Sequence, residues 1–417
     1  MMLSNRVIVS VGLLSSQTAT GSLSFAISLY LLDITKSVSL FSLAVALSFV
    51  PSVVISLLSG VWVDRWAKKR VICLSDLFTG LFTIGFVLTV DWSTTLNALL
   101  FYIVIIAAIQ SLLNLSFNAA LPELFAEQEL PAANGLIQSV TAVTRIVAPI
   151  TGALLYGYVD LFTIFCLSGA TYFASSAIQT QLQIKKQVNK TPADEISYFS
   201  AQKEVFSYIK EHRSIRFFLL YEVLLNSIYL PFILVMMPFV TYQVWGVSPF
   251  QLSLIEASIA IGTILGAVIA SRTWMQKRLI RYFCLLLIPQ SMILMVWGYP
   301  FSEENNTINI TAVFSGLLLI LAILNTIQNI PVLSQFQRTV PQHMLGRLFG
   351  IFFAFLNLAV PAGVWILGSM LSRENWQQFI MFGSVFMIGI SLLGNKNKSF
   401  RSFVNENLSN TTVKVTV

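Results

Sequence analysis

The sequence predicts an all-α membrane protein with twelve transmembrane helices in two pseudo-symmetric six-helix bundles and both termini in the cytoplasm. Its 417 residues are 56% hydrophobic and only 10% charged, with a mean hydropathy of +0.78. Soluble domains carry about 25% charged residues, so a chain this poor in charge would expose too much apolar surface in water. Two further observations support the prediction: the basic residues gather on one side of the alternating loops, and the second half of the chain echoes the first.

Twelve apolar segments are long enough to cross a bilayer, which takes about 20 residues per helix. We expect the spans at 7–32, 39–62, 71–90, 95–118, 133–158, 160–182, 216–243, 250–271, 280–299, 309–333, 347–371 and 376–394. The first segment has no small-residue cleavage site after it, so it is interpreted as a span rather than a signal peptide. The expected domains are an N-terminal bundle (1–182), a cytoplasmic linker (183–215), a C-terminal bundle (216–395) and a cytoplasmic tail (396–417).

Basic residues predict the orientation of these spans. When loops are assigned to alternate sides, one side holds Lys36 and Arg373 and no other Lys or Arg. The opposite side holds both termini, the 63–70 loop and the long 183–215 stretch, all of which carry Lys or Arg. The positive-inside rule places this basic side in the cytoplasm. The formal net charge of +7 is therefore a topology signal, and it does not indicate a nucleic-acid partner.

The sequence offers no catalytic, metal or cofactor motif. Three cysteines are scattered within apolar segments, at Cys73, Cys166 and Cys284, and they form no disulfide framework or zinc-binding spacing. No glycine loop ending in Lys-Ser or Lys-Thr is present to hold ATP phosphates. We therefore expect a protein that is not an enzyme, needs no cofactor or metal, and is not driven by ATP.

Two loop segments carry the internal repeat. Residues 122–135 follow the fourth span and residues 337–350 follow the tenth, and each segment places a polar turn, a Leu and a Gly at matching positions. Six spans, a linker and six echoing spans are typical of a parallel repeat. The span after each loop carries a proline and then a glycine at middle depth: Pro149 with Gly152, and Pro361 with Gly363.

The most specific string in the chain is Gly-Val-Trp-Val-Asp-Arg-Trp-Ala-Lys-Lys-Arg at 60–70. Gly60 allows close helix approach at the end of the second span, and Asp64 can accept hydrogen bonds from a neighbouring helix N-terminus. A charged loop of this kind can make contacts in one conformation and break them in another. We predict a conformational latch that consists of Gly60, Asp64, Arg65, Lys68, Lys69 and Arg70 and is braced by Asp76.

This string resembles the signature loop of the major facilitator superfamily. The Pro-Glu-Leu…Leu-Pro-Ala-Ala-Asn-Gly pattern at 122–135 resembles the branch that holds macrolide efflux pumps, enterobactin-type siderophore exporters and a lysophospholipid transporter. The string 145–152 loosely resembles the proline–glycine motif of the superfamily's antiporters, with Ala148 where a glycine usually precedes the proline. The counterpart loop at 271–278 has no acidic residue, so the latch is expected mainly in the first half. The resemblance implies a transporter whose first, fourth, seventh and tenth spans line the cavity.

Charged side chains inside the spans cost about 2.5–3.5 kcal/mol each at the bilayer centre, so those present need a role. Arg145 lies near the middle of span five, Glu222 in the cytoplasmic third of span seven, and Glu256 in the outer third of span eight. We predict that Glu222 and Glu256 couple transport to protons; for each charge, an ion pair or hydrogen bond between helices is the alternative. The predicted substrate-binding residues are Gln17, Asn114, Arg145, Glu222, Asn226, Asn325 and Asn357.

The resemblance and the charges within the spans together predict a proton-coupled exporter of an amphipathic small molecule, in the inner membrane of a bacterium. An anionic siderophore would suit Arg145 and a cationic macrolide would suit Glu222, and the sequence does not decide between them. The alternatives are a transporter of lysophospholipid or other lipid and, third, an importer of a nutrient. The expected partners are the small-molecule substrate, protons and membrane lipid, with no nucleic acid, and the chain is expected to be a monomer.

Overall fold

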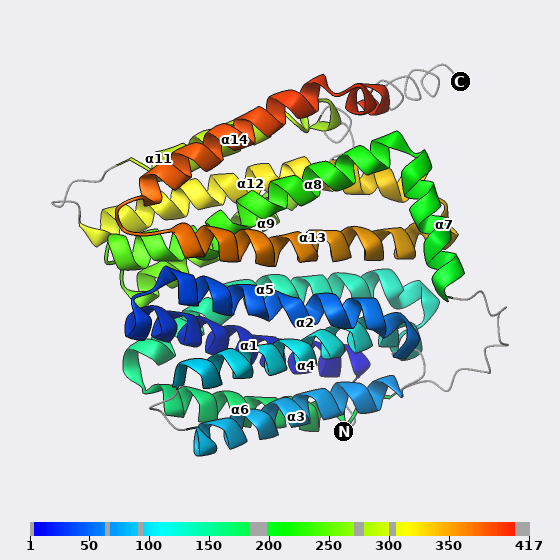
Figure 1. Ribbon diagram of the computed structural model, residues 1–417. Coiled ribbons are helices and arrows are strands. Elements are labelled where there is room, and N and C mark those ends of the chain that lie inside the picture. The colour runs from blue at the N-terminus through cyan, green and yellow to red at the C-terminus, as the bar shows by residue number, and fades with distance from the viewer. Residues whose placement is uncertain are drawn as a thin grey trace. The chain divides into compact units, whose positions relative to one another are not determined.

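The computed structural model describes residues 4–62, 67–90, 95–183, 198–270, 279–299 and 306–404, which are almost entirely helical and contain no strand (Figure 1). Helices suit this composition because a backbone in hydrocarbon must satisfy its hydrogen bonds within its own segment. Among the described residues, nine helices are long and apolar enough to cross a membrane, and Leu287–Trp297 and Ala354–Met370 are shorter apolar helices. The count of twelve spans and the cytoplasmic position of both termini stay predictions.

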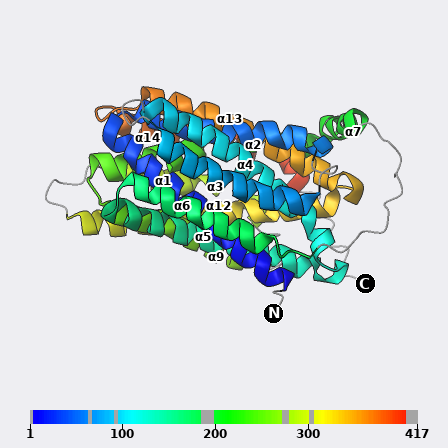
Figure 2. The ribbon, with the colours of Figure 1, turned by 90° about the horizontal axis from the view of Figure 1, so that it is seen from below.

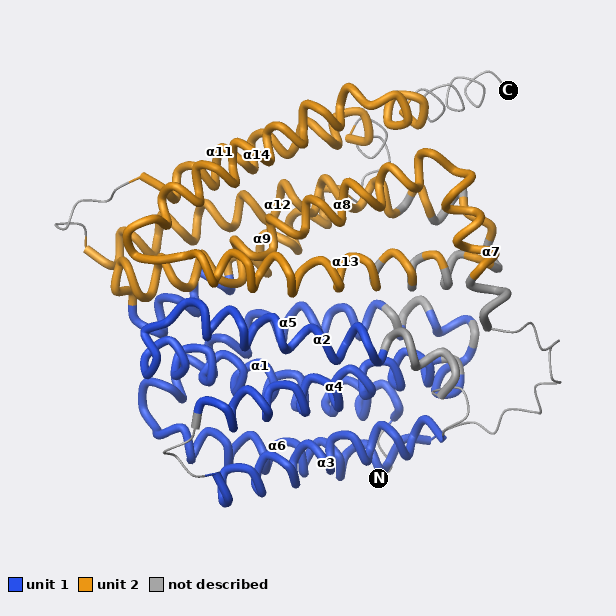
Figure 3. Tube along the Cα trace, in the orientation of Figure 1, with its two compact units in different colours: residues 1–198, 248–257 blue, residues 199–247, 258–417 orange. Residues whose placement is uncertain are grey.

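The chain divides into two compact units (Figure 3). Unit 1 comprises Met1–Tyr198 and Ser248–Ala257, and unit 2 comprises Phe199–Val247 and Ser258–Val417. The helices of unit 1 are α1 (Asn5–Thr35), α2 (Val38–Trp62), α3 (Lys68–Thr89), α4 (Thr95–Leu124), the 3-10 turn η1 (Glu127–Glu129), α5 (Leu130–Tyr158) and α6 (Leu161–Gln179). The helix α9 (Pro249–Ala270) begins in unit 1 and ends in unit 2.

The other helices belong to unit 2. They are α7 (Tyr198–Glu211), α8 (Arg213–Pro231), the π-helical segments η2 (Phe232–Met236) and η3 (Phe239–Val244), α11 (Leu287–Trp297), α12 (Thr307–Thr339), α13 (Gln342–Met370) and α14 (Trp376–Lys396). The predicted 183–215 linker thus contains α7, an amphipathic helix whose apolar side buries Val205. Helices α4 and α12 extend further into the polar loops than their predicted ends at 118 and 333.

Unit 1 is built around α1, which packs against α5 and α6 (Figure 2). Helix α3 packs against α4 and α6, and α2 packs against α4. Buried apolar side chains form two clusters in this unit: one holds Leu13 and Phe117, and the other holds Ile27 and Phe165. Close helix packing of this kind is what holds helices together in a bilayer, where lipid tails are as apolar as leucine.

In unit 2, α8 packs against α13 and α11 packs against α14. The ring of Phe218 on α8 lies at the centre of an aromatic cluster, with the centroids of Phe403 and Phe283 at 4.9 and 5.1 Å. Beyond Pro231, α8 continues as two π-helical segments, so the predicted 216–243 span is a helical rod with wider turns in its second half. Pro238 has no N–H to donate and crowds the turn before it, where η2 lies, and a locally wider helix accommodates this.

The predicted span at 280–299 is not one continuous helix. Turns at 283–286 precede α11, and the backbone there makes bonds of the tighter kind, such as Ile288 N–H to Leu285 O at 3.0 Å. Side chains from other helices take the carbonyls of this turn: Gln328 Nε2 donates to Phe283 O at 2.9 Å, and Ser391 Oγ donates to Cys284 O at 2.6 Å. The helix is interrupted in the turn before Pro289, which has no N–H to donate to Leu285 O, and tertiary hydrogen bonds take the neighbouring carbonyls.

Candidate functional site

Asp76 is a fully buried carboxylate at the junction of three helices in unit 1. It lies on α3 and its side chain is 0% exposed. Ser16 Oγ on α1 donates to Asp76 Oδ1 at 2.7 Å, while Ser175 Oγ and Gln179 Nε2 on α6 donate to Oδ2 at 2.6 and 2.7 Å. A buried carboxylate is tolerated when its oxygens are hydrogen-bonded in this way. Asp76 therefore ties α3 to α1 and α6.

The predicted latch lies only partly within the described residues. Asp64 and Arg65 fall outside them, and of Gly60 only the helical backbone is described. Lys69 is half-buried and Arg70 is exposed near the start of α3. The described partners of Asp76 come from α1 and α6 rather than from the 63–70 loop, so a bracing role for Asp76 toward the loop stays a prediction.

Lys68 is the latch residue for which the structure defines a partner. It begins α3, and its ammonium forms an ion pair with Glu123 near the end of α4. Both side chains are only 15% exposed. Glu123 belongs to the 122–135 segment, so this pair connects the two motifs by which the sequence resembles its family. Sequence inspection missed Glu123 because the two residues lie 55 positions apart.

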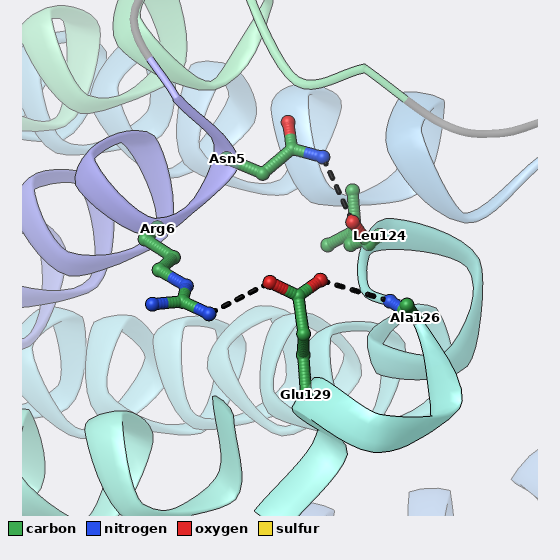
Figure 4. A network of polar contacts seen from close by, with 5 residues as sticks. All are labelled: Asn5, Arg6, Leu124, Ala126 and Glu129. Atoms are coloured by element: carbon green, nitrogen blue, oxygen red, sulfur yellow. Dashed lines mark hydrogen bonds and ion pairs between the residues drawn. The ribbon is translucent and has the colours of Figure 1, made fainter. Parts of the chain in front are cut away.

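The same segment is also held by the start of α1 (Figure 4). Arg6 Nη2 donates to Glu129 Oε1 at 2.7 Å, and the other oxygen of Glu129 accepts from the backbone N–H of Ala126 at 3.2 Å. Asn5 Nδ2 donates to Leu124 O at 3.0 Å. In unit 1, the loop after α4 is thus fixed from two sides, by α1 and by the start of α3.

Glu222 is the buried carboxylate among the described residues of unit 2. It lies on α8 with 6% of its surface exposed, and Asn226 Nδ2 one turn later donates to Glu222 Oε2 at 3.0 Å and to its backbone oxygen at 2.9 Å. No Lys or Arg forms an ion pair with it within the part of the chain that the structure describes. A single amide donor leaves a negative charge here far less compensated than that of Asp76.

No described hydrogen bond joins the other predicted site residues to Glu222 or Asn226. Glu256 and Gln17 are half-buried, and Arg145 and Asn114 are exposed. Asn325 accepts from Asn329 Nδ2 through its carbonyl oxygen at 3.1 Å. Among the described residues, Glu222 and Asn226 are the only two predicted substrate-binding side chains joined by a hydrogen bond. The predicted residues divide between the two units. Unit 1 contains Gln17, Asn114, Arg145 and Glu256, and unit 2 contains Glu222, Asn226, Asn325 and the half-buried Asn357.

A buried amide pair in unit 2 is absent from the predicted site. Gln290 Nε2 on α11 donates to Gln328 Oε1 on α12 at 2.6 Å, and the two side chains are 0% and 1% exposed. Both amides stand in apolar runs, which is the one signal in the sequence that marks them. Gln328 also donates to the turn that interrupts the predicted 280–299 span. Its described hydrogen bonds therefore hold helices together, which is a structural role.

Comparisons with known proteins give the family. The sequence profile of the Major Facilitator Superfamily matches residues 9–364. Macrolide efflux protein A of Streptococcus pyogenes is 24% identical over 388 residues, which cover 89% of this chain and 90% of that protein. Macrolide efflux protein A of Enterococcus faecalis is 24% identical over 335 residues, covering 76% of this chain and 97% of that protein.

Solved structures show the same fold. The nucleoside transporter NupG has a TM-score of 0.72 at 14% identity and covers 95% of this chain and 100% of that chain. A bacterial homologue of the iron transporter ferroportin, in an inward-facing state, has a TM-score of 0.71 at 15% identity and covers 94% of this chain and 99% of that chain. The chain is therefore a multi-pass membrane transporter rather than an enzyme, and it belongs to the major facilitator superfamily.

Proposed function

We propose that this protein is a secondary active exporter that moves an amphipathic small molecule out of a bacterial cell in exchange for protons, by alternating access. The likeness to two macrolide efflux proteins over most of the chain supports export. The observation that carries the proton exchange is Glu222, a buried carboxylate with one amide donor and no cationic partner among the described residues.

The charge of Glu222 links a proton to the substrate. A carboxylate enclosed by protein in the membrane is costly to keep ionised without a countercharge. Two groups can neutralise it: a proton, or a cation on the substrate. If the proton and the substrate compete for Glu222, the binding of either one releases the other. A proton gradient across the membrane then drives export of the substrate. Asn226 orients the carboxylate in both states.

The negative charge of Glu222 also favours one class of cargo. A site that exchanges a proton for a substrate at a carboxylate fits an amphipathic molecule with a basic amine, such as a macrolide. An anionic cargo, such as a siderophore, would instead need Arg145, whose side chain is exposed on α5 and forms no ion pair with a described carboxylate. We therefore place the cationic cargo first and keep the anionic one as the competing outcome.

The test uses proteoliposomes loaded with a radiolabelled macrolide, under an imposed pH gradient. Glu222→Gln keeps the shape of the side chain and removes the titrating oxygen. We therefore expect the rate of gradient-driven transport to fall at least about tenfold, which corresponds to a free-energy change of about 1.4 kcal/mol. Substrate exchange without a gradient should persist at a reduced rate. Asp160→Asn, at a position before α6 and outside the candidate spans, is the matched loss of one carboxylate and should transport normally.

Two results would contradict the proposal. If Glu222→Gln still transports in proportion to the pH gradient, Glu222 is not the proton carrier. If Arg145→Gln abolishes binding of an anionic catecholate while the macrolide is not transported by the native chain, the cargo is the anionic one. Elution as a single symmetric peak in size-exclusion chromatography establishes that each variant is folded before transport is measured.

A further inference from the structure

A groove runs between α8 and α14 in unit 2, with a volume of about 360 Å³. Its α8 wall consists of residues at helical spacing, from Arg213 and Arg216 to Leu220 and Leu224. Positions three, four, seven and eight apart lie on one face of a helix, so this wall is a single stripe. The α14 wall follows the same rule and includes Leu393. The groove is therefore a continuous surface between two helices rather than an irregular hollow.

The groove is basic at one end. Arg213 and Arg216 are both exposed, and Arg216 Nη1 donates to the backbone oxygen of Lys210 at 3.1 Å. Neither forms an ion pair with a carboxylate among the described residues, and no acidic residue lines the groove. Beyond Arg213 the surface continues into a second hollow of about 610 Å³, where Glu211 is the single acidic lining residue and Lys398 adds a further cation.

The rest of the groove is apolar and open to the side. Leu220, Leu224 and Leu393 are 62%, 44% and 73% exposed. The ring of Tyr221 lies against Gly394, where a β-carbon would approach it to 2.7 Å, so the missing side chain lets the tyrosine close the floor of the groove. From Arg216 to Leu224 the wall rises about 12 Å at 1.5 Å per residue, close to the depth of one hydrocarbon leaflet, about 15 Å.

We propose that this groove binds a phospholipid with an anionic headgroup from the leaflet on the side of the basic loops. Its phosphodiester would lie between Arg213 and Arg216, and one acyl chain would lie along Leu220, Leu224 and Leu393. Arginine binds phosphate oxygens through two parallel N–H donors, so two guanidinium groups with no described carboxylate partner, at the head of an apolar groove, match both ends of such a lipid. This inference is independent of the proposed cargo, because the lipid is a bound component and is not transported.

Native mass spectrometry of the full chain in detergent tests it, with added phosphatidylglycerol, phosphatidylcholine or inorganic phosphate. We expect phosphatidylglycerol to bind at least about tenfold more tightly than phosphatidylcholine. Each cation near an anionic lipid contributes a factor of about five, so the double variant Arg213→Gln/Arg216→Gln should lose about thirtyfold of the affinity for phosphatidylglycerol. Leu393→Trp fills the groove while both arginines remain, and it should also lose binding.

The matched control is Lys203→Gln/Lys210→Gln, which removes two positive charges from exposed positions on α7. It should keep the affinity of the native chain. Equal losses in the control and in the arginine variant would mean that net charge alone attracts the lipid, and would overturn the proposal. Undiminished phosphatidylglycerol binding by the arginine variant would also overturn it. Displacement of the lipid by millimolar inorganic phosphate would mean that the site holds a free anion, which equally contradicts a lipid site.

Discussion

Gly152 on α5 lies directly against the backbone carbonyl of Ser22 on α1, so closely that a β-carbon at position 152 would be 2.6 Å from that oxygen. The same relationship recurs in unit 2, where Gly363 on α13 lies against the carbonyl of Ser227 on α8. Both glycines are the ones that follow the mid-span prolines of the two half-repeats. In each half of the chain the proline–glycine helix thus packs closely on the helix of the first predicted span of that half, α1 or α8.

We predict that Gly152→Ala destabilises the protein, because the added methyl group meets backbone atoms that cannot rotate away. Overpacking of this kind costs about 1–3 kcal/mol. Thermal unfolding in detergent, followed by tryptophan fluorescence, should show a clear fall in melting temperature. Gly157→Ala on the same helix is the control, because no described atom beyond its own helical turns lies within 4 Å of a β-carbon there. It should leave the melting temperature unchanged or slightly raised, since alanine favours helix over glycine.

Asp76→Asn should destabilise unit 1, although it changes only one atom of the side chain. One oxygen becomes an NH2 group that faces donors, so at least one buried donor loses its acceptor, at a cost of about 1–3 kcal/mol. Adding Gln179→Glu should restore much of the stability, because the new carboxylate can accept from the new amide. If the double variant is no more stable than Asp76→Asn alone, as measured by thermal unfolding, the hydrogen bond between these two residues is not what stabilises the junction.

The sequence allows the helices to be predicted but not the partners of the buried polar groups. Hydropathy is a sum over neighbouring residues, so the apolar segments are visible without any structure. Glu222 was visible as a charge in such a segment, and its i,i+4 spacing to Asn226 made their contact predictable. The partners of Asp76 come from α1 and α6, 60 and up to 103 positions away, and which face of each helix meets α3 is decided by packing.

The interruption before α11 is marked in the sequence by Pro289. Proline at position 289 has no N–H to donate to Leu285 O and its ring crowds that carbonyl, so the turn at 283–286 does not continue as a regular helix into α11. The span predicted at 280–299 is continuous because hydropathy gives this proline no weight. The sequence does not show which side chains take the carbonyls beside the break: Gln328 and Ser391, from other helices, donate to Phe283 O and Cys284 O.

Asp160 gives a prediction about pH. It precedes α6, and hydrogen bonds from the Thr163 hydroxyl and backbone N–H lower the pKa of its carboxyl below the ordinary value. A depressed pKa in the folded state means that the contribution of the charged carboxylate is present above the unfolded pKa and is lost as the pH falls through the folded one. At neutral pH, Asp160→Asn should therefore have a lower thermal stability than the native chain. This difference should shrink as the pH falls below about 4. A difference that stays constant down to pH 3 would contradict this.

The two ion pairs on the 122–135 segment should differ in strength. The side chains of Lys68 and Glu123 are each 15% exposed, whereas those of Arg6 and Glu129 are 56% and 42% exposed. Water and salt screen the second pair more strongly, so a double-mutant cycle should give about 1 kcal/mol of coupling for Lys68 with Glu123 and close to zero for Arg6 with Glu129. The cycles use Lys68→Met, Glu123→Gln, Arg6→Met and Glu129→Gln with thermal unfolding at low and high salt. A coupling for Arg6–Glu129 that equals or exceeds that of Lys68–Glu123 would mean that exposure does not set the strength of these pairs, and that the start of α1 rather than the start of α3 is the stronger hold on this loop.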